Sequence, residues 1–293
     1  MEKGKELFTN KDLKKLIIPL IIEQLLTVTV GLADSIMISS VGEAAVSGVS
    51  LVDSIMILLI NMFSALATGG AVVAGQYLGQ KKHVMACKTA DQLILFISAL
   101  AAVIMAGIYA MRGFILHGVF GAIEPAVMHS AEVYLLIVTA SIPFLAVYNG
   151  CAALFRTMGN SKTAMQMSLF MNAVNIIGNA VLIYGVGMGV EGAAIPTLAS
   201  RVIAAAVILV LLKNRNQAVH ISRNFNFKFK GFLVGRILKI GVPNGVENSM
   251  FQLGKILVLS LVAGFGTASI TANAVSNMVA MFEIIPGMAV GLA

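Results

Sequence analysis

Ionisable and amide side chains inside long apolar runs are the residues of this sequence best suited to chemistry. Asp34 lies in the run Gly-Leu-Ala-Asp-Ser-Ile-Met-Ile-Ser-Ser-Val-Gly, which offers hydroxyls and small residues but no base. A carboxylate in hydrocarbon must face a wet cavity, pair with a base or take up a proton. We therefore predict that Asp34 binds a proton or another cation, as an ion-coupled transporter requires. The alternative is a solvated, inert acid at the outer membrane interface.

A second set consists of amides and one hydroxyl. Asn172, Asn175 and Asn179 follow one another at spacings of three and four residues, which places them on one face of a helix. Asn149 closes an earlier apolar run, and Thr197 follows a proline in a later one. Such residues either hydrogen-bond between helices or line a cavity. Three amides on one face favour the cavity.

Membrane-spanning helices must position these groups. Hydrophobic residues make up 58% of the chain and charged residues 11%, against roughly 25% charged in soluble domains. Apolar runs of spanning length predict an all-α polytopic membrane protein without a soluble catalytic domain. The predicted spans are Leu16–Ile38, Val46–Ala74, Gln92–Met111, Val133–Leu154, Ala164–Val186, Gly192–Leu212, Ile237–Ala263 and Ile270–Ala293.

An internal repeat divides these spans into two lobes. Lys15–Ala44 aligns without a gap with Lys239–Ala268, at an offset of 224 (239 − 15 = 224). The five identities include a proline and a glutamate four residues apart in apolar sequence, where a glutamate is costly. Repeated helical bundles are typical of secondary transporters, which bind substrate between the repeats.

The repeat sets the domain boundaries that we expect. Residues 1–212 form a first lobe of six helices, preceded by a short cytoplasmic segment at 1–15. Residues 213–236 form a cytoplasmic linker, with an interfacial segment or a strand at 224–230. Residues 237–293 form the first two helices of a second lobe. Since a second lobe should also have six helices, we expect the sequence to be truncated.

Other charged residues fall within these spans. Glu23 and Glu247 occupy equivalent inner positions of the repeat, and Asp53 lies near the start of the second span. Glu23 and Asp53 are candidates for a gate or lobe interface; snorkelling or solvated acids are the alternative. Arg201, near the middle of the sixth span, is expected to pair with a buried acid.

Three residues are candidates for chemistry in the second lobe. Glu283 has a leucine at its repeat position, so its role would be particular to that lobe. Lys255 lies eight residues after Glu247 and is a candidate counter-ion for a nearby acid.

The basic residues predict an orientation. With a cytoplasmic amino terminus, seventeen of the 20 lysines and arginines fall on the cytoplasmic side, and Arg112 alone falls outside. This follows the positive-inside rule. We expect a multi-pass protein of the bacterial inner membrane with its amino terminus inside. The net charge of +7 therefore reflects orientation and not a nucleic-acid partner.

Motifs for other classes of protein are missing from the sequence. There is no Walker, Gly-x-Ser-x-Gly or His-Glu-x-x-His motif. Cys87, Cys151 and the four histidines lack the spacing of metal ligands. We expect neither an enzyme nor a cofactor, and no metal beyond Na⁺ at Asp34.

Several segments together resemble the multidrug and toxic compound extrusion (MATE) antiporters. They are the Asp34 segment, Arg156-Thr-Met-Gly-Asn-Ser-Lys, Asn175-x-x-x-Asn179, Gly189-Val-Glu-Gly-Ala-Ala-Ile-Pro-Thr197 and Gly241-Val-Pro. The resemblance implies two six-helix lobes around a V-shaped cleft and export of organic cations or amphiphiles in exchange for Na⁺ or H⁺. It also implies cation or proton binding at Asp34, beside Asn149, Asn175 and Thr197.

Two positions depart from the family's pattern. Asn179 stands where the family often has an aspartate, which removes half of a carboxylate pair. Phe251 stands where some members have a glutamate, one turn beyond Glu247. The choice between Na⁺ and H⁺ and the second-lobe site stay open.

Two alternatives stay open as well. A lipid-linked oligosaccharide flippase of related architecture would line its cleft with several basic residues, whereas the first lobe offers essentially Arg201. A membrane protein without transport would not need the repeat. We expect a monomer whose partners are amphiphilic or cationic small molecules and the bilayer.

Overall fold

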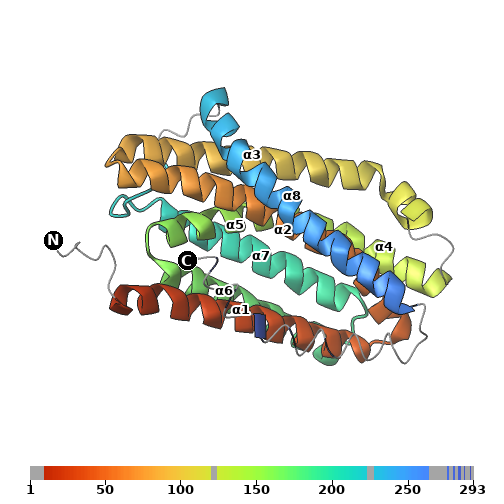
Figure 1. Cartoon of the computed structure of the whole chain (residues 1–293). Coiled ribbons are helices and arrows are strands. Elements are labelled where there is room, and N and C mark those ends of the chain that lie inside the picture. The colour runs from red at the N-terminus through yellow and green to blue at the C-terminus, as the bar shows by residue number, and fades with distance from the viewer. Residues whose placement is uncertain are drawn as a thin grey trace.

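The computed structural model describes residues 10–119, 124–222 and 228–263, together with the single positions 276, 280, 283, 284, 287 and 291. These residues contain helices and no strand, so the predicted all-α fold is confirmed (Figure 1). The elements are α1 (Asn10–Ser39), α2 (Glu43–Gly79), α3 (His83–Ala110), the π-helix η1 (Phe114–Val119), α4 (Pro125–Thr139), α5 (Ile142–Thr157), α6 (Ser161–Asn179), the π-helix η2 (Ala180–Gly185), α7 (Glu191–Leu212) and α8 (Gly231–Ala263).

Five of the described helical segments are long and apolar enough to cross a membrane, and α4 and α5 together, bent by 50° at the break between them, have the length and composition of a sixth. The bend follows from Pro143, which has no N–H to donate to the carbonyl of Thr139 four residues earlier. At the break, the Ser141 hydroxyl donates to the Val138 carbonyl at 2.6 Å. The chain thus places a hydroxyl-bearing break within the apolar part of the bundle.

Several helices begin before the predicted spans: α3 at His83 and not Gln92, α4 at Pro125 and not Val133, and α8 at Gly231, inside the predicted linker. Helix α1 begins at Asn10, and its membrane-spanning part starts at Leu16 as predicted. The predicted interfacial segment at 224–230 and the eighth span fall largely outside the described residues. The division into lobes stays a prediction.

Helix α2 is the centre of the packing, since it contacts α3, α4, α5 and α8. Helix α8 crosses α2 where two glycines meet, and a Cβ atom on Gly69 would lie 2.7 Å from the Gly241 nitrogen. Only glycine allows that approach, which is how helices pack in membranes without a hydrophobic driving force. The largest fully buried side chains include Phe63 of α2 and Phe155 of α5.

Helix α1 lies along one edge of the bundle and packs mainly on α6 (Figure 1). Few of its described side chains are buried: Leu20, Glu23, Val30 and Ile38. Because its apolar contacts are sparse, polar contacts to neighbouring helices contribute much of its attachment.

Candidate functional site

The site forms where α1 meets α6 and η2. The Asp34 carboxylate accepts a hydrogen bond from Asn179, with 2.7 Å between Oδ1 and Nδ2. Asn179 is the last residue of α6 and is 1% exposed, and the π-helix η2 follows it directly. Such π-helical turns often occur at functional sites. The partly buried Asp34 carboxyl therefore lies against the polar face of α6.

Asn175 links Asp34 to α7. With its amide nitrogen toward the carboxylate, it donates to Asp34 Oδ1 at 3.1 Å and accepts from the Thr197 hydroxyl at 3.1 Å. The opposite orientation would set the amide oxygen against the carboxylate, so the hydrogen-bond network selects the first. The structure thus brings together four predicted residues from α1, α6 and α7.

The site contains a hydrogen-bond acceptor that has no partner among the described residues. Asn179 Oδ1 is buried and has no hydrogen-bond partner among the described residues. It belongs to the amide that donates to Asp34, so an oxygen acceptor lies beside a carboxylate. Oxygen ligands of this kind suit hard cations such as Na⁺, and a carboxylate held by neutral donors can also accept a proton.

A second polar cluster lies beside the first. Asp53 of α2 accepts from the Tyr134 hydroxyl of α4 at 3.2 Å. Arg201 of α7 donates through Nη1 to the Ser141 hydroxyl, at the α4–α5 break, at 2.7 Å. Neither Asp53 nor Asp34 lies within ion-pair distance of Arg201. The expected direct pair between Arg201 and an acid is therefore replaced by a hydroxyl contact.

Glu23 has a different environment. Its Oε1 forms an ion pair with Arg156 Nη2 of α5 at 2.6 Å, and the glutamate is 5% exposed. Glu23 and Asp34 are eleven residues apart, about three helical turns, so both project from the same face of α1. Glu23, predicted as a gate or interface residue, thus fastens α1 to α5 within the first lobe.

The remaining predicted residues lie outside this site. Asn149 makes no hydrogen bond to Asp34, and its buried Nδ2 has no partner among the described residues. Glu247 is exposed on α8, and Glu283 is exposed at its single described position. The side chain of Lys255 lies outside the described part of the chain. The second-lobe candidates stay predictions.

Three contributing residues were not anticipated in these roles: Tyr134, Ser141 and Arg156. Each meets a partner far away in sequence, between 60 and 133 residues for the contacts above. The only available signal for Ser141 was its place two residues before Pro143, where a helix breaks.

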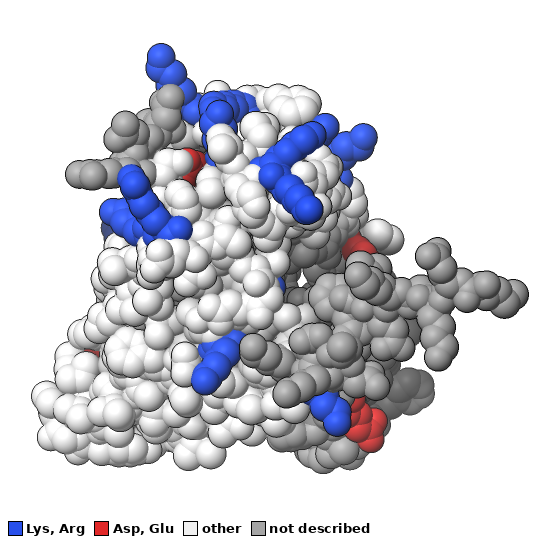
Figure 2. All heavy atoms as spheres, turned by 90° about the vertical axis from the view of Figure 1, so that its left-hand side faces the viewer, with Lys and Arg blue, Asp and Glu red and all other residues white. Residues whose placement is uncertain are grey.

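The bundle end at which α2 meets α3 is basic. Figure 2 shows lysine and arginine side chains standing out over this face, and the exposed residues there include Lys81, Lys82, Lys88 and Lys213. Asp34 is instead close to the opposite end of α1. These exposed basic side chains thus lie at the end of the bundle away from the Asp34 site.

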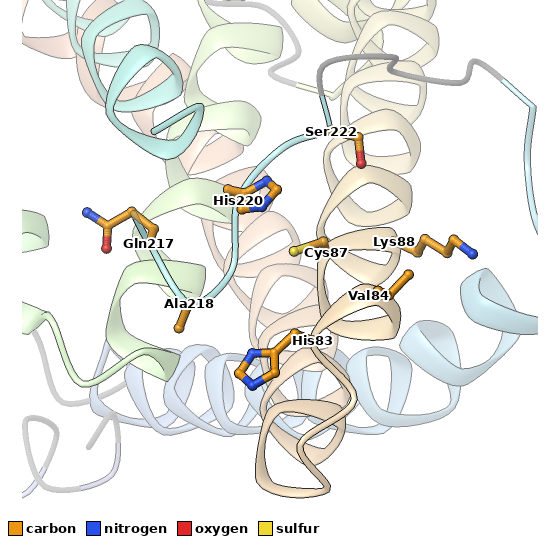
Figure 3. A pocket seen from close by; sticks show the side chains of 8 residues that line it. All are labelled: His83, Val84, Cys87, Lys88, Gln217, Ala218, His220 and Ser222. Atoms are coloured by element: carbon orange, nitrogen blue, oxygen red, sulfur yellow. The ribbon is translucent and has the colours of Figure 1, made fainter. Parts of the chain in front are cut away.

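A cavity of about 400 Å³ opens at this basic end, between the start of α3 and residues 217–222 (Figure 3). Three hydrogen bonds hold the segment after α7 against α3. Asp91 Oδ1 accepts from the Ser222 amide at 3.0 Å, Gln92 Oε1 accepts from the Lys230 amide at 2.6 Å, and Gln92 Nε2 donates to the Lys228 carbonyl at 3.1 Å. The cavity is lined by His83, Val84, Cys87, Lys88, Gln217, Ala218, His220 and Ser222. None of these residues contacts the Asp34 site.

Known proteins resemble this chain in sequence. The chain is 30% identical over 278 residues to the uncharacterized transporter YisQ of Bacillus subtilis (strain 168), covering 93% of this chain and 60% of that protein. It is 22% identical to the probable multidrug resistance protein NorM of Thermotoga maritima, covering 97% of this chain and 61% of the relative. The chain thus spans about three fifths of the length of these relatives.

The fold also matches solved structures. A MOP superfamily transporter from Pyrococcus furiosus superimposes with a TM-score of 0.88 at 22% identity, over 96% of this chain and 62% of that one. The family model described as MatE matches residues 19–181, which include Asp34, Asn175 and Asn179. Because this match extends over more than half of the sequence, the chain belongs to the MatE family of membrane transporters.

Proposed function

We propose that the protein exports cationic or amphiphilic small molecules in exchange for H⁺ or Na⁺ by alternating access. The observation that carries the proposal is the environment of Asp34. Neutral amides hold this carboxylate, and no described basic side chain lies within ion-pair distance of it. Its charge is therefore available to a cation.

Coupling requires that the ion bind two conformations with different affinity, because equal affinity shifts no equilibrium. Asp34 supports such a difference because its partners Asn179 and Asn175 lie on another helix, α6, and Asn175 in turn accepts from Thr197 of α7. A cation at Asp34 cancels the charge that these amides stabilise. The contact between α1 and α6 then weakens, and the lobe rearranges so that substrate leaves.

Both coupling ions fit the chain's own residues. For Na⁺, Asp34, the free Asn179 oxygen and the Thr197 hydroxyl are the candidate ligands. For H⁺, Asp34 is the group that carries the proton. The relatives named as multidrug resistance proteins favour small-molecule export over the flippase alternative.

The basic face of Figure 2 supports a cytoplasmic amino terminus in a bacterial inner membrane, since the positive-inside rule places lysine and arginine on that side. Helix α1 begins at Asn10, and the exposed Lys14 follows in its second turn. Cysteine labelling of Asn10→Cys with a membrane-impermeant maleimide tests this: labelling in inverted vesicles and not in intact cells is expected. Labelling in intact cells alone contradicts it.

Ethidium efflux from proteoliposomes that hold the full-length protein tests the function. With an inward H⁺ or Na⁺ gradient, the wild type should export ethidium, and Asp34→Asn should lose at least about 100-fold of the coupled rate, since the ion site is removed. Glu43→Gln, at the exposed first turn of α2, is the matched control and should stay within about twofold. Coupled export by Asp34→Asn at the wild-type rate overturns the proposal.

A further inference from the structure

The cavity at the basic end of the bundle has two walls of different structure (Figure 3). In the segment after α7, Ala218, His220 and Ser222 line the cavity, whereas the alternating residues Val219 and Ile221 are buried in the core. Such alternation is typical of an extended chain, whose successive side chains point to opposite sides. The other wall is one face of the first two turns of α3.

Hydrogen bonds hold the extended wall in place. The Ser222 amide donates to Asp91 Oδ1 of α3 at 3.0 Å, and the Ile221 amide donates to the Leu212 carbonyl at 3.1 Å. The chain around the cavity is therefore already ordered, and a ligand that enters it would not lose affinity to ordering of the wall.

The polar side chains that line the cavity supply hydrogen-bond donors. His83, Lys88, Gln217 and Ser222 make no side-chain hydrogen bond to any described residue. None of the described lining residues is acidic, and the nearby Asp91 is engaged with the Ser222 amide. Helix α3 also has no acid in its first turn to offset the positive end of its dipole. Free donors beside a lysine suit an oxyanion, above all a phosphate group.

The cavity lies at the depth of a membrane boundary. The charged residues of α3 end at Asp91, and an uncharged apolar stretch follows. Phe229 and Phe232, which are 55% and 63% exposed, lie where Gln92 binds the chain before α8. Exposed phenylalanines next to lysines are typical of segments that lie among lipid headgroups.

We propose that the cavity binds the phosphate group of an anionic phospholipid in the leaflet at this end of the bundle. Its volume of about 400 Å³ holds a phosphodiester with a small alcohol such as glycerol. The exposed Val84 lies in the α3 wall and offers apolar contact to the lipid. The bound lipid would join α3 to the segment that leads to α8. This site is separate from Asp34 and does not depend on the proposed transport function.

Alkylation of Cys87 by N-ethylmaleimide reports on the occupant, because this thiol lines the cavity and points toward the 217–222 segment (Figure 3). In the purified full-length protein, phosphatidylglycerol should slow alkylation of Cys87, followed by mass spectrometry of its peptide. Half-protection should need at least about tenfold more phosphatidylcholine, which has no net charge, because charge-assisted hydrogen bonds are the stronger ones. Native mass spectrometry of the same protein counts the bound lipid independently of the reactivity of Cys87.

Two variants test the donors. Lys88→Gln should weaken phosphatidylglycerol binding at least about tenfold, and Ser222→Ala about fivefold, as expected for a charged and a neutral hydrogen bond. Lys88→Arg keeps the charge and should stay within about threefold. Lys213→Gln removes an exposed charge from the same end, outside the cavity, and is the matched control that should stay within about twofold.

Three results would overturn the inference. Equal binding and protection by the two lipids would mean that the phosphate is not recognised by its charge. Equal losses in Lys88→Gln and Lys213→Gln would mean that only the general charge of this face matters. Protection by inorganic phosphate at the concentration that suffices for phosphatidylglycerol would assign the cavity to a soluble phosphate and not to a lipid.

Discussion

Glu23 and Asp34 lie on the same face of α1 but contact different partners. Glu23 is in contact with the guanidinium of Arg156, so its charge is neutralised within the fold. Asp34, about three turns further along, has only amide donors in hydrogen-bond contact and keeps its charge. The difference separates an acid that fastens the helix from one that can respond to an ion.

The largest expected effect concerns Glu23, whose ion pair with Arg156 joins α1 to α5. Arg156→Met leaves Glu23 buried without its partner and should lower the free energy of unfolding by about 3 kcal/mol. The low end of the usual range applies because the Arg156 side chain is 19% exposed. Unfolding of the full-length protein in a detergent titration measures this. Lys162→Met, at an exposed position of α6, should cost less than about 0.5 kcal/mol, and an equal cost in both would contradict the comparison.

The ion affinity of Asp34 should depend on the amides that donate hydrogen bonds to it. Asn179→Ala removes the 2.7 Å hydrogen bond to Asp34 and the free oxygen beside it. The apparent affinity for Na⁺ should fall about tenfold because a ligand oxygen is lost, whereas that for H⁺ should rise about tenfold because the charged carboxylate loses a donor. Ion-dependent ethidium efflux measures both.

Asn172, which lies on the same helix as Asn175 and Asn179, supplies the control. Asn172 makes no hydrogen bond through its buried Nδ2 to any described residue, so Asn172→Ala should leave both affinities within about twofold. Equal changes in the two variants would mean that the stripe acts as packing and not as an ion site.

A smaller effect is expected at the edge of the site. Thr197→Val leaves the Asn175 amide oxygen without its donor and should change coupled efflux about fivefold, equivalent to a single neutral hydrogen bond. Thr29→Val, whose hydroxyl bonds to its own helix at Leu25, is the matched control on α1. Efflux that is unchanged by Thr197→Val would mean that Asn175 does not contribute to the response to the ion.

The residues of the site that were predicted are those marked by local sequence patterns. A spacing of three and four residues placed Asn175 and Asn179 on one face of a helix, and an acid in apolar sequence marked Asp34. The structure brings these residues together. The spans followed from apolar length in the same way, whereas the break between α4 and α5 falls inside the single predicted span Val133–Leu154 and was not predicted.

The part that was not predicted depends on which helices are neighbours. Asp53 meets Tyr134 and Arg201 meets Ser141 only because α2, α4, α5 and α7 pack together. No periodicity within one helix encodes that arrangement. For the same reason Glu23 was identified as unusual while Arg156, 133 residues away, was not identified as its partner.

Release of a cation when substrate binds to the purified full-length protein tests the central claim most directly. Ethidium should displace about one H⁺ or Na⁺ per folded wild-type molecule, and the same amount from Glu23→Gln, because that acid does not hold the ion. Asp34→Asn should release none. Equal release from Asp34→Asn and the wild type would contradict the account, because the ion would then be held elsewhere.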